Sequence, residues 1–130
     1  MRTILACALV LLVLVPGCKK QQESREVQQA KGFITAMSTG DYAGAAGRFD
    51  ANMQAAMPVD SLKEAWLGVE GQVGKFTRYV NTTTDQTTEN GKVYTLVVVT
   101  CQFEKGKIDV KTVFDADGKL AGLWFAPPQQ

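Results

Sequence analysis

The sequence predicts an α+β domain in which three N-terminal helices pack on one face of a four-stranded antiparallel meander. Three observations predict this class. Apolar residues recur at helical spacing between residues 24 and 72, whereas residues 93–104 form a β-branched run with a period of two. Three short turn signals then divide the C-terminal half into strands. Helices followed by hairpin-linked strands are typical of an α+β domain.

The first two helices are marked by their ends. Apolar residues recur at helical spacing from about Ser24 to Thr39, and Gly40 is placed to end this helix. Asp41 can then cap a second helix, whose apolar stripe extends to Phe49. We expect both helices to bury one face against the sheet.

The third helix follows a break. Residues 50–58 are predicted as irregular structure that ends in a proline. Ser61 and Glu64 then form a capping-box pattern, which opens a helix that extends to about residue 72. Trp66 lies on the apolar face of this helix, where it is either a core residue or a wall of a ligand pocket.

The strand at residues 93–104 is the centre of the predicted sheet. Its odd-numbered residues are mostly apolar and face the core. A two-residue turn at Asn90-Gly91 would place Arg78 opposite Phe103 on this inner face. The sequence therefore predicts that Arg78 points inward.

Two further turns complete the meander. A turn at residues 105–106 would place Cys101 opposite Val110, and residues 117–118 form the turn to the last strand. Each turn puts the apolar residues of neighbouring strands on the same inner face. A slip of one residue would invert this face, so the agreement of the three turns supports the meander.

Few polar side chains face the predicted interior. Arg78 and Thr112 lie on the inner face and, together with Trp66, are the candidates for lining a ligand pocket. An inward arginine near a strand end can extend to the rim, pair with a carboxylate or bind an anionic ligand. These alternatives stay open at the level of sequence.

The opposite face of the sheet also collects apolar residues. They are Tyr94, Leu96, Val98, Val113 and Trp124. A contiguous patch of this kind is too large to remain in contact with water. We therefore expect this outer face to form a homodimer or to bind an envelope protein, unless a helix covers it.

The composition restricts the chemistry. The 130 residues include 14 Lys and Arg against 13 Asp and Glu, so no charge excess indicates nucleic-acid binding. The sequence contains no His, which removes the commonest general base and metal ligand. We expect no catalytic residue, metal or cofactor, and a non-enzymatic binding module. The alternative is a small isomerase or hydrolase that uses a buried carboxylate as its base.

The N-terminus predicts export. The apolar run at residues 4–15 is shorter than the roughly 20 residues that span a bilayer, but it suits a signal peptide over residues 1–17. Residues 14–18 (LVPGC) resemble a bacterial lipobox, although Pro16 departs from the usual small residue. The resemblance implies that Cys18 carries diacylglycerol and an acyl chain such as palmitate, which anchor the protein to the membrane. An ordinary secretory signal with a chance cysteine is the alternative.

The remaining sequence divides into a tether and one domain. Residues 18–26 are polar and would form the lipidated tether, and residues 27–127 would form the domain. Lys19 differs from the Asp that favours inner-membrane retention, so the protein is expected at the outer membrane of a Gram-negative bacterium, facing the periplasm.

The chain resembles two known groups. The order of its helices and strands resembles the cystatin-like, nuclear-transport-factor-like cone, which implies a pocket between helices and sheet and an outer sheet face that often dimerises. Its motifs also resemble a family of bacterial domains of unknown function 3887, over about residues 27–127. The resembling residues are Gly40-Asp41-Tyr42, Phe49-Asp50, Met53 to Pro58, Leu62, Trp66, Gly74-Lys75-Phe76, Cys101 to Gly106, Asp115 to Lys119 and Gly122 to Phe125. These motifs are structural, so the resemblance implies the fold and no catalytic residue.

Overall fold

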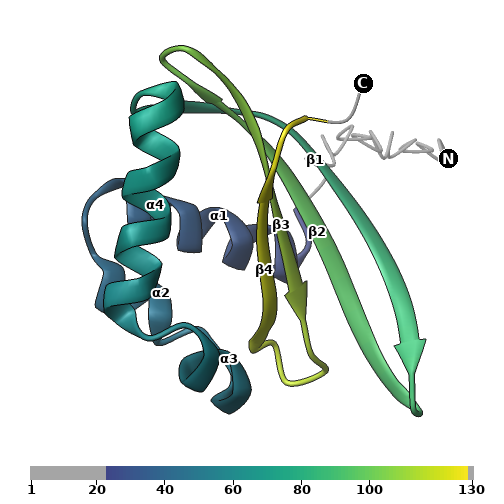
Figure 1. The fold of residues 1–130 in the computed structure, drawn as a ribbon. Coiled ribbons are helices and arrows are strands. Elements are labelled where there is room, and N and C mark those ends of the chain that lie inside the picture. Colours follow the sequence, from purple (N-terminus) through teal and green to yellow (C-terminus); the bar gives the residue numbers. More distant parts are fainter. Residues whose placement is uncertain (1–22, 129–130) are drawn as a thin grey trace, which may run out of the picture.

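The computed structural model describes residues 23–128, in which four helices lie on one face of a four-stranded antiparallel sheet (Figure 1). The elements are α1 (Arg25–Ser38), α2 (Tyr42–Ala46), α3 (Ala51–Ala56), α4 (Val59–Val73), β1 (Phe76–Glu89), β2 (Lys92–Phe103), β3 (Gly106–Phe114) and β4 (Leu120–Ala126). The strands pair in the order β1-β2-β3-β4, so the predicted meander is confirmed. The predicted signal peptide, Cys18 and the first part of the tether lie outside the described residues.

Helix α1 begins and ends close to where the sequence predicts. The Ser24 hydroxyl accepts a hydrogen bond from the backbone N–H of Val27 at 3.3 Å, which caps the helix. Gly40 follows with a φ of 85°, a left-handed conformation that favours glycine. Residues 25–26, predicted as the end of the tether, are already helical. The buried stripe of the helix consists of Val27, Ala30, Phe33, Ile34 and Met37.

The described residues form four helices, so the prediction of three was wrong. The extra helix is α3, which lies in the segment that was expected to be irregular. Asp50 caps it by accepting a hydrogen bond from the backbone N–H of Met53 at 2.8 Å. None of the α3 residues is fully buried, so no apolar stripe marks this helix in the sequence.

Helix α4 begins before its predicted capping box. Pro58 occupies the N-cap position without a side-chain hydrogen bond, and Ser61 lies inside the first turn. Proline is well placed there, because its fixed φ suits a helix start and it has no N–H to satisfy. The predicted helix is therefore correct in type, but its start was predicted three residues too late.

Gly74 ends α4 at a position that excludes other residues. Its φ is 80°, and an added Cβ would lie 2.7 Å from the Cβ of Glu104. We expect Gly74→Ala to lower the free energy of unfolding by about 1–3 kcal/mol, measured by urea denaturation.

The matched control lies in the same helix. An added Cβ at Gly71 meets nothing within 4 Å, so Gly71→Ala should be neutral or stabilise the protein by up to about 1 kcal/mol. Equal destabilisation by the two substitutions would contradict the geometry described for Gly74.

Strands β1 and β2 keep the predicted register only near their turn. Asn90 and Gly91 form this turn, with φ values of 52° and 76° that suit a type I′ hairpin. Pairing follows the prediction over residues 81–89, where Thr82 lies opposite Val99. Beyond this point, two irregularities in β1 shift the register, one between Tyr79 and Asn81 and one nearer the start of the strand.

The prediction that Arg78 points inward was wrong. Arg78 pairs with Gln102 rather than Phe103, and its side chain is exposed. A bulge adds one residue to a strand and thereby exchanges the faces of the residues that follow it. Tyr79 consequently packs against the core in place of Arg78, and the second irregularity leaves Phe76 facing the core opposite Phe103.

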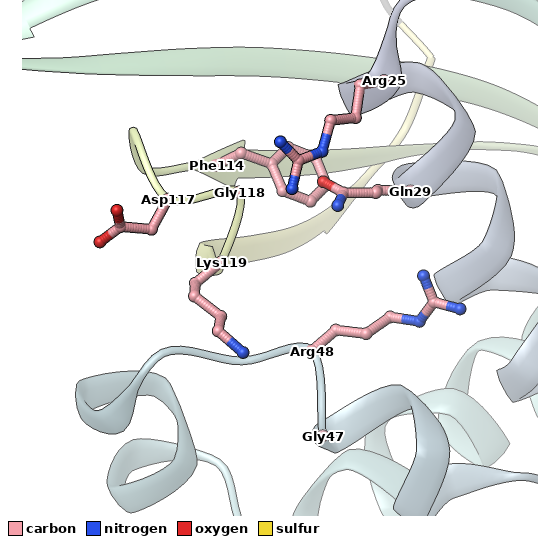
Figure 2. Close-up of a pocket in the computed structure, with 8 residues that line it drawn as sticks. All are labelled: Arg25, Gln29, Gly47, Arg48, Phe114, Asp117, Gly118 and Lys119. Carbon is pink, nitrogen blue, oxygen red and sulfur yellow. The ribbon is translucent and has the colours of Figure 1, made fainter.

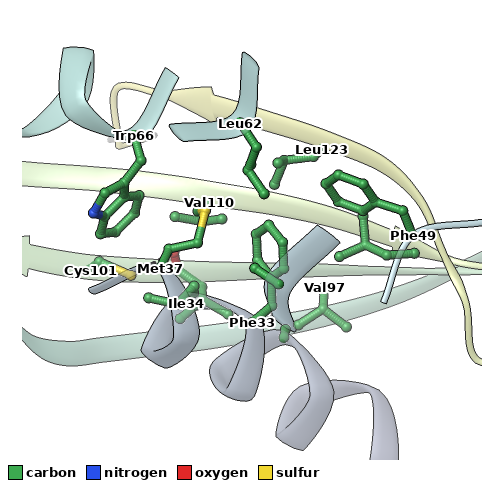
Figure 3. Close-up of a cluster of buried hydrophobic side chains, with 14 of the residues drawn as sticks. Phe33, Ile34, Met37, Phe49, Leu62, Trp66, Val97, Cys101, Val110 and Leu123 are labelled. Atoms are coloured by element: carbon green, nitrogen blue, oxygen red, sulfur yellow. Dashed lines mark hydrogen bonds between the residues drawn. The ribbon is translucent and has the colours of Figure 1, made fainter. Parts of the chain in front are cut away.

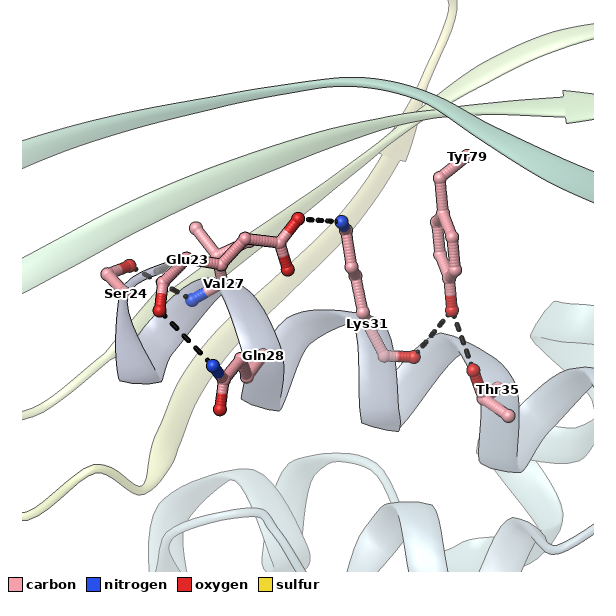
Figure 4. A network of polar contacts seen from close by, with 7 residues as sticks. All are labelled: Glu23, Ser24, Val27, Gln28, Lys31, Thr35 and Tyr79. Carbon is pink, nitrogen blue, oxygen red and sulfur yellow. Dashed lines mark hydrogen bonds and ion pairs between the residues drawn. The ribbon is translucent and has the colours of Figure 1, made fainter. Parts of the chain in front are cut away.

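Tyr79 joins β1 to α1 (Figure 4). Its hydroxyl donates a hydrogen bond to the backbone oxygen of Lys31 at 2.7 Å and lies 2.6 Å from Oγ1 of Thr35. The ammonium of Lys31 lies 5.3 Å from the centre of the Tyr79 ring and pairs with Glu23. Partial burial raises the pKa of Tyr79, so its hydroxyl remains a donor across the neutral range.

Strands β2 and β3 are offset by two residues from the predicted register. Cys101 lies opposite Ile108 rather than Val110, because Glu104 and Lys105 form the turn. A shift of two residues leaves every side chain on its predicted face. The turn is held against the end of α4, where the N–H of Lys105 donates to the backbone oxygen of Val73 at 2.8 Å.

The core lies between the helices and the inner face of the sheet (Figure 3). Phe103, Val110 and Leu123 come from three strands and share this core, as the predicted meander requires. Every buried core residue lies between Val27 and Leu123. A chain that begins at Glu23 therefore retains the whole core and is expected to fold on its own.

Candidate functional site

Trp66, a predicted pocket residue, is part of the core. Its side chain is fully buried, and Nε1 donates a hydrogen bond to Oε1 of Glu70 at 2.8 Å. The ring centre lies 5.6 Å from that of Phe103 and 6.1 Å from that of Phe125. Other side chains therefore occupy the space around Trp66 where a ligand was considered.

The other two predicted pocket residues do not join Trp66 around a cavity. Thr112 is fully buried, and its hydroxyl donates to the backbone oxygen of Val97 at 2.9 Å. Arg78 is exposed, because the β1 bulges turn it away from the core. The structure thus separates the three residues, and the prediction of a shared pocket was wrong.

The five predicted interface residues lie together on the outer face of the sheet. Leu96 and Val113 are paired across β2 and β3. Trp124 is 56% exposed, and its ring lies over Gly122, where an added Cβ would be 2.7 Å from Cη2 of the ring. None of the helices α1–α4 covers this face (Figure 1).

Two hollows occupy this outer face. Tyr94, Val113 and Trp124 contribute to the lining of one, with a volume of about 350 Å³. Leu96 and Val98 contribute to the lining of the other, with a volume of about 360 Å³. The remaining lining of both hollows is mostly polar, and in the first hollow it includes Asp50 and Asn52 at the start of α3.

Asp109 is a buried carboxylate at the second hollow. It is 4% exposed, and its Oδ1 accepts a hydrogen bond from the hydroxyl of Thr100 at 2.6 Å. The residue lies on the outer face, opposite the core-facing Val110 that follows it. The buried acid thus lies outside the core that the helices and the inner face of the sheet enclose.

Cys101 is a core residue, as predicted. Burial, and to a lesser extent the negative charge of Asp109, raise the pKa of the Cys101 thiol to about 12. A thiol is nucleophilic only after it loses its proton. Cys101 is therefore unsuited to act as a nucleophile at neutral pH.

A pocket that the sequence analysis did not identify lies beside the start of α1 (Figure 2). Its volume is about 200 Å³, and three cationic side chains, Arg25, Arg48 and Lys119, contribute to its lining. The pocket also includes Gln29, Gly47, Phe114, Asp117 and Gly118. The backbone brings Arg48 to the β3–β4 turn, because its carbonyl accepts from the N–H of Leu120 at 2.8 Å.

Within residues 23–128, no cluster of three or more His, Cys, Asp or Glu side chains is arranged to hold a metal ion. No helix in that part of the chain is long and apolar enough to cross a membrane.

Comparison with known proteins supports the fold and the family. No curated protein is significantly similar to the chain. The structure is similar to an NMR structure of a protein from Ruminococcus gnavus ATCC 29149, with a TM-score of 0.66 and 21% sequence identity, covering 78% of this chain and 90% of that one. At this identity the likeness concerns the fold. A family model described as "Protein of unknown function (DUF3887)" matches residues 30–123, and the chain therefore belongs to the DUF3887 family.

Proposed function

We propose that the protein is a non-enzymatic, lipid-anchored interaction module of the bacterial cell envelope. The N-terminal sequence supports the anchor, through the signal-like run and the lipobox-like residues that end at Cys18. The outer membrane of a Gram-negative bacterium, with the domain facing the periplasm, is the proposed location. The partner is a second copy of the chain or another envelope protein.

The observation that carries this proposal is the uncovered outer face of the sheet. Trp124 is 56% exposed there, beside the Leu96–Val113 pair, while all four helices of residues 23–128 pack on the opposite face. Exposed aromatic side chains that are surrounded by apolar residues are typical centres of protein interfaces. Contact with a protein would remove this apolar surface from water.

The distribution of carboxylates favours an interaction module over the alternative, an isomerase or hydrolase. Such an enzyme would need an acidic side chain inside the cone to act as a base. The strand register places no Asp or Glu on the inner face of the described sheet. Glu70 on α4 is bonded to Trp66, and the buried Asp109 belongs to the outer face.

Charged substitutions on the outer face test the proposal. We expect Leu96→Glu combined with Trp124→Glu to weaken self-association or partner binding by about tenfold or more, because a carboxylate would have to be desolvated in the interface. The measurements are sedimentation equilibrium of residues 23–130 and recovery of cross-linked proteins from the envelope of the native host.

The matched control is on the helical layer. Leu67 and Val59 are 46% and 40% exposed on α4, so Leu67→Glu combined with Val59→Glu introduces the same two charges at exposed apolar positions. This variant should behave as the wild type in both measurements. The proposed interface is wrong if the outer-face variant keeps its wild-type oligomeric state and its cross-linked partners.

A further inference from the structure

We propose that the pocket beside the start of α1 binds a phosphate group. Arg25, Arg48 and Lys119 reach it from three separate segments of the chain, and Asp117 is the one carboxylate among its lining residues. Figure 2 shows the Asp117 carboxylate directed away from the other side chains. A protein whose formal net charge is +1 thus gathers three cations around a single small cavity.

The three cations are not used in ion pairs within the described chain. The ion pair found in residues 23–128 joins Lys31 to Glu23, and it involves none of the pocket residues. Like charges that surround a small recess repel one another, and an anion placed between them removes this repulsion. Arginine is well suited to this role, because its planar guanidinium can donate two parallel hydrogen bonds to a phosphate.

Glycines allow two of the cations to approach the backbone closely. The guanidinium of Arg25 lies 3.2 Å from the position that a Cβ of Gly118 would occupy. That of Arg48 lies 3.1 Å from the corresponding position at Gly32. Gly118 lines the pocket, and a Cβ there would press on the Arg25 guanidinium, so the backbone at this glycine helps to define the pocket.

The β3–β4 turn holds its part of the pocket in place. Oδ1 of Asp115 accepts hydrogen bonds from the backbone N–H groups of Asp117 at 3.0 Å and Lys119 at 2.8 Å. The N–H of Gly118 donates to the backbone oxygen of Asp115 at 3.0 Å. Lys119 therefore extends from an ordered turn, which reduces the entropy lost when a ligand binds.

Gln29 supplies the second observation that points to a ligand. Its Oε1 is buried and accepts no hydrogen bond from any described residue. A buried acceptor without a donor destabilises the protein, and most such groups in native structures have a partner. Gln29 lines the pocket, so a rotation of its side chain would bring this oxygen to the cavity, where it would accept from the hydroxyl of a hydrogen phosphate or of a glycerol phosphate while the phosphate oxygens contact the cations.

The volume of the pocket restricts the ligand to a small one. A cavity of about 200 Å³ is below the volumes of pockets that hold drug-sized ligands, roughly 300–1,000 Å³. A phosphate group with a few additional atoms fits this size, whereas a nucleotide does not. The chemistry that the pocket recognises is therefore a phosphate accompanied by a hydroxyl.

Two sources could supply this group, free phosphate and the head group of a membrane lipid. The second source depends on the proposed lipid anchor. Arg25 follows Cys18 by seven residues, and a fully extended chain of that length spans at most about 25 Å. If Cys18 is lipidated, the pocket is confined to the vicinity of the bilayer surface.

Binding measurements on residues 23–130 test the proposal. The probes are inorganic phosphate and glycerol 1-phosphate in calorimetry, and phosphatidylglycerol or phosphatidylcholine vesicles in co-sedimentation, all at one ionic strength. We expect Arg48→Gln combined with Lys119→Gln to weaken phosphate binding at least tenfold. Both side chains are exposed, so the fold should be retained, which circular dichroism would verify.

Two further variants make the test specific. Lys105→Gln combined with Lys107→Gln removes the same charge near the opposite end of β3 and should bind phosphate as the wild type does. Gln29→Met removes the unsatisfied oxygen, so it should weaken phosphate binding without lowering the melting temperature of the free protein.

Each outcome distinguishes the alternatives. Binding of inorganic phosphate that is lost in the Arg48 and Lys119 variant supports a site for free phosphate. Binding confined to glycerol 1-phosphate and phosphatidylglycerol vesicles, with the same dependence on these residues, supports a lipid head group. No binding of any probe, or equal binding by this variant and the wild type, would overturn the site. The outer-face variants do not touch the pocket, so the two proposals fail independently.

Discussion

Trp66→Ala is expected to lower the free energy of unfolding by about 3–5 kcal/mol. The Trp66 side chain is fully buried and packs against the rings of Phe103 and Phe125, so its loss leaves a cavity between α4 and the sheet. Domains of this size have total stabilities of about 5–15 kcal/mol, so the variant would retain only part of its stability. Urea denaturation of residues 23–130, followed by circular dichroism, measures the change.

Two companion variants separate packing from hydrogen bonding at Trp66. Trp66→Phe keeps an aromatic ring but removes the bond from Nε1 to Glu70, and it should cost about 1–2 kcal/mol. Leu67→Ala, at the exposed neighbouring position, should change stability by less than about 0.5 kcal/mol. If Trp66→Ala were no more destabilising than Leu67→Ala, the described packing of α4 on the sheet would be incorrect.

The Cys101 thiol is expected to react with iodoacetamide on the order of a thousandfold more slowly in the folded protein than in denaturant at the same neutral pH. Burial and the nearby Asp109 raise the pKa of Cys101 to about 12. A free cysteine has a pKa of about 8.5, so the reactive thiolate is far less populated in the native state. Mass spectrometry of residues 23–130, which contain this one cysteine, follows the reaction.

The same pKa shift predicts a loss of stability at alkaline pH. The unfolded thiol ionises above a pH of about 8.5, whereas the folded thiol keeps its proton up to a pH of about 12. The contribution of Cys101 is therefore fully present below the unfolded pKa and is lost as the pH rises through the folded pKa. The free energy of unfolding should fall less steeply in this range for Cys101→Ala than for the wild type. Identical pH profiles would contradict the burial of the thiol.

The meander could be predicted because its turns have strong local signals. The left-handed conformations of Asn90 and Gly91 follow from their chemistry, and the β-branched alternation in β2 identifies its buried face. The β1 bulges could not be predicted, since they depend on how β1 packs across β2 and α1. The incorrect inward position of Arg78 follows directly from this missing information.

Helix α3 shows a second limit of predicting helices from the spacing of apolar residues. Its Asp50 cap is a local signal, but the helix has no fully buried residue and so has no apolar stripe. Apolar periodicity does not reveal a short helix that is marked by its N-cap and has no buried face. Trp66 illustrates the converse, because its apolar neighbours identified a buried position without deciding between core and pocket.

The outer face and the cationic pocket differ in how far the sequence reveals them. Alternation along β2 places Leu96 on the outer face from sequence alone, and the strand pairing brings it to Val113. Arg25, Arg48 and Lys119 are far apart in the chain and share no motif. The backbone contact between Arg48 and Leu120 brings two of these segments together, and Arg25 reaches the pocket from α1.

Oxidative footprinting in the native envelope tests the central claim most directly, because it reports whether a partner covers the outer face. The measured quantity is hydroxyl-radical labelling of Trp124 relative to that of Leu67, which is exposed on the helical layer. We predict that this ratio is several-fold lower in the wild type than in Leu96→Glu, whose added charge should release the partner. Equal ratios in the two proteins would contradict the claim that the outer sheet face is an interface.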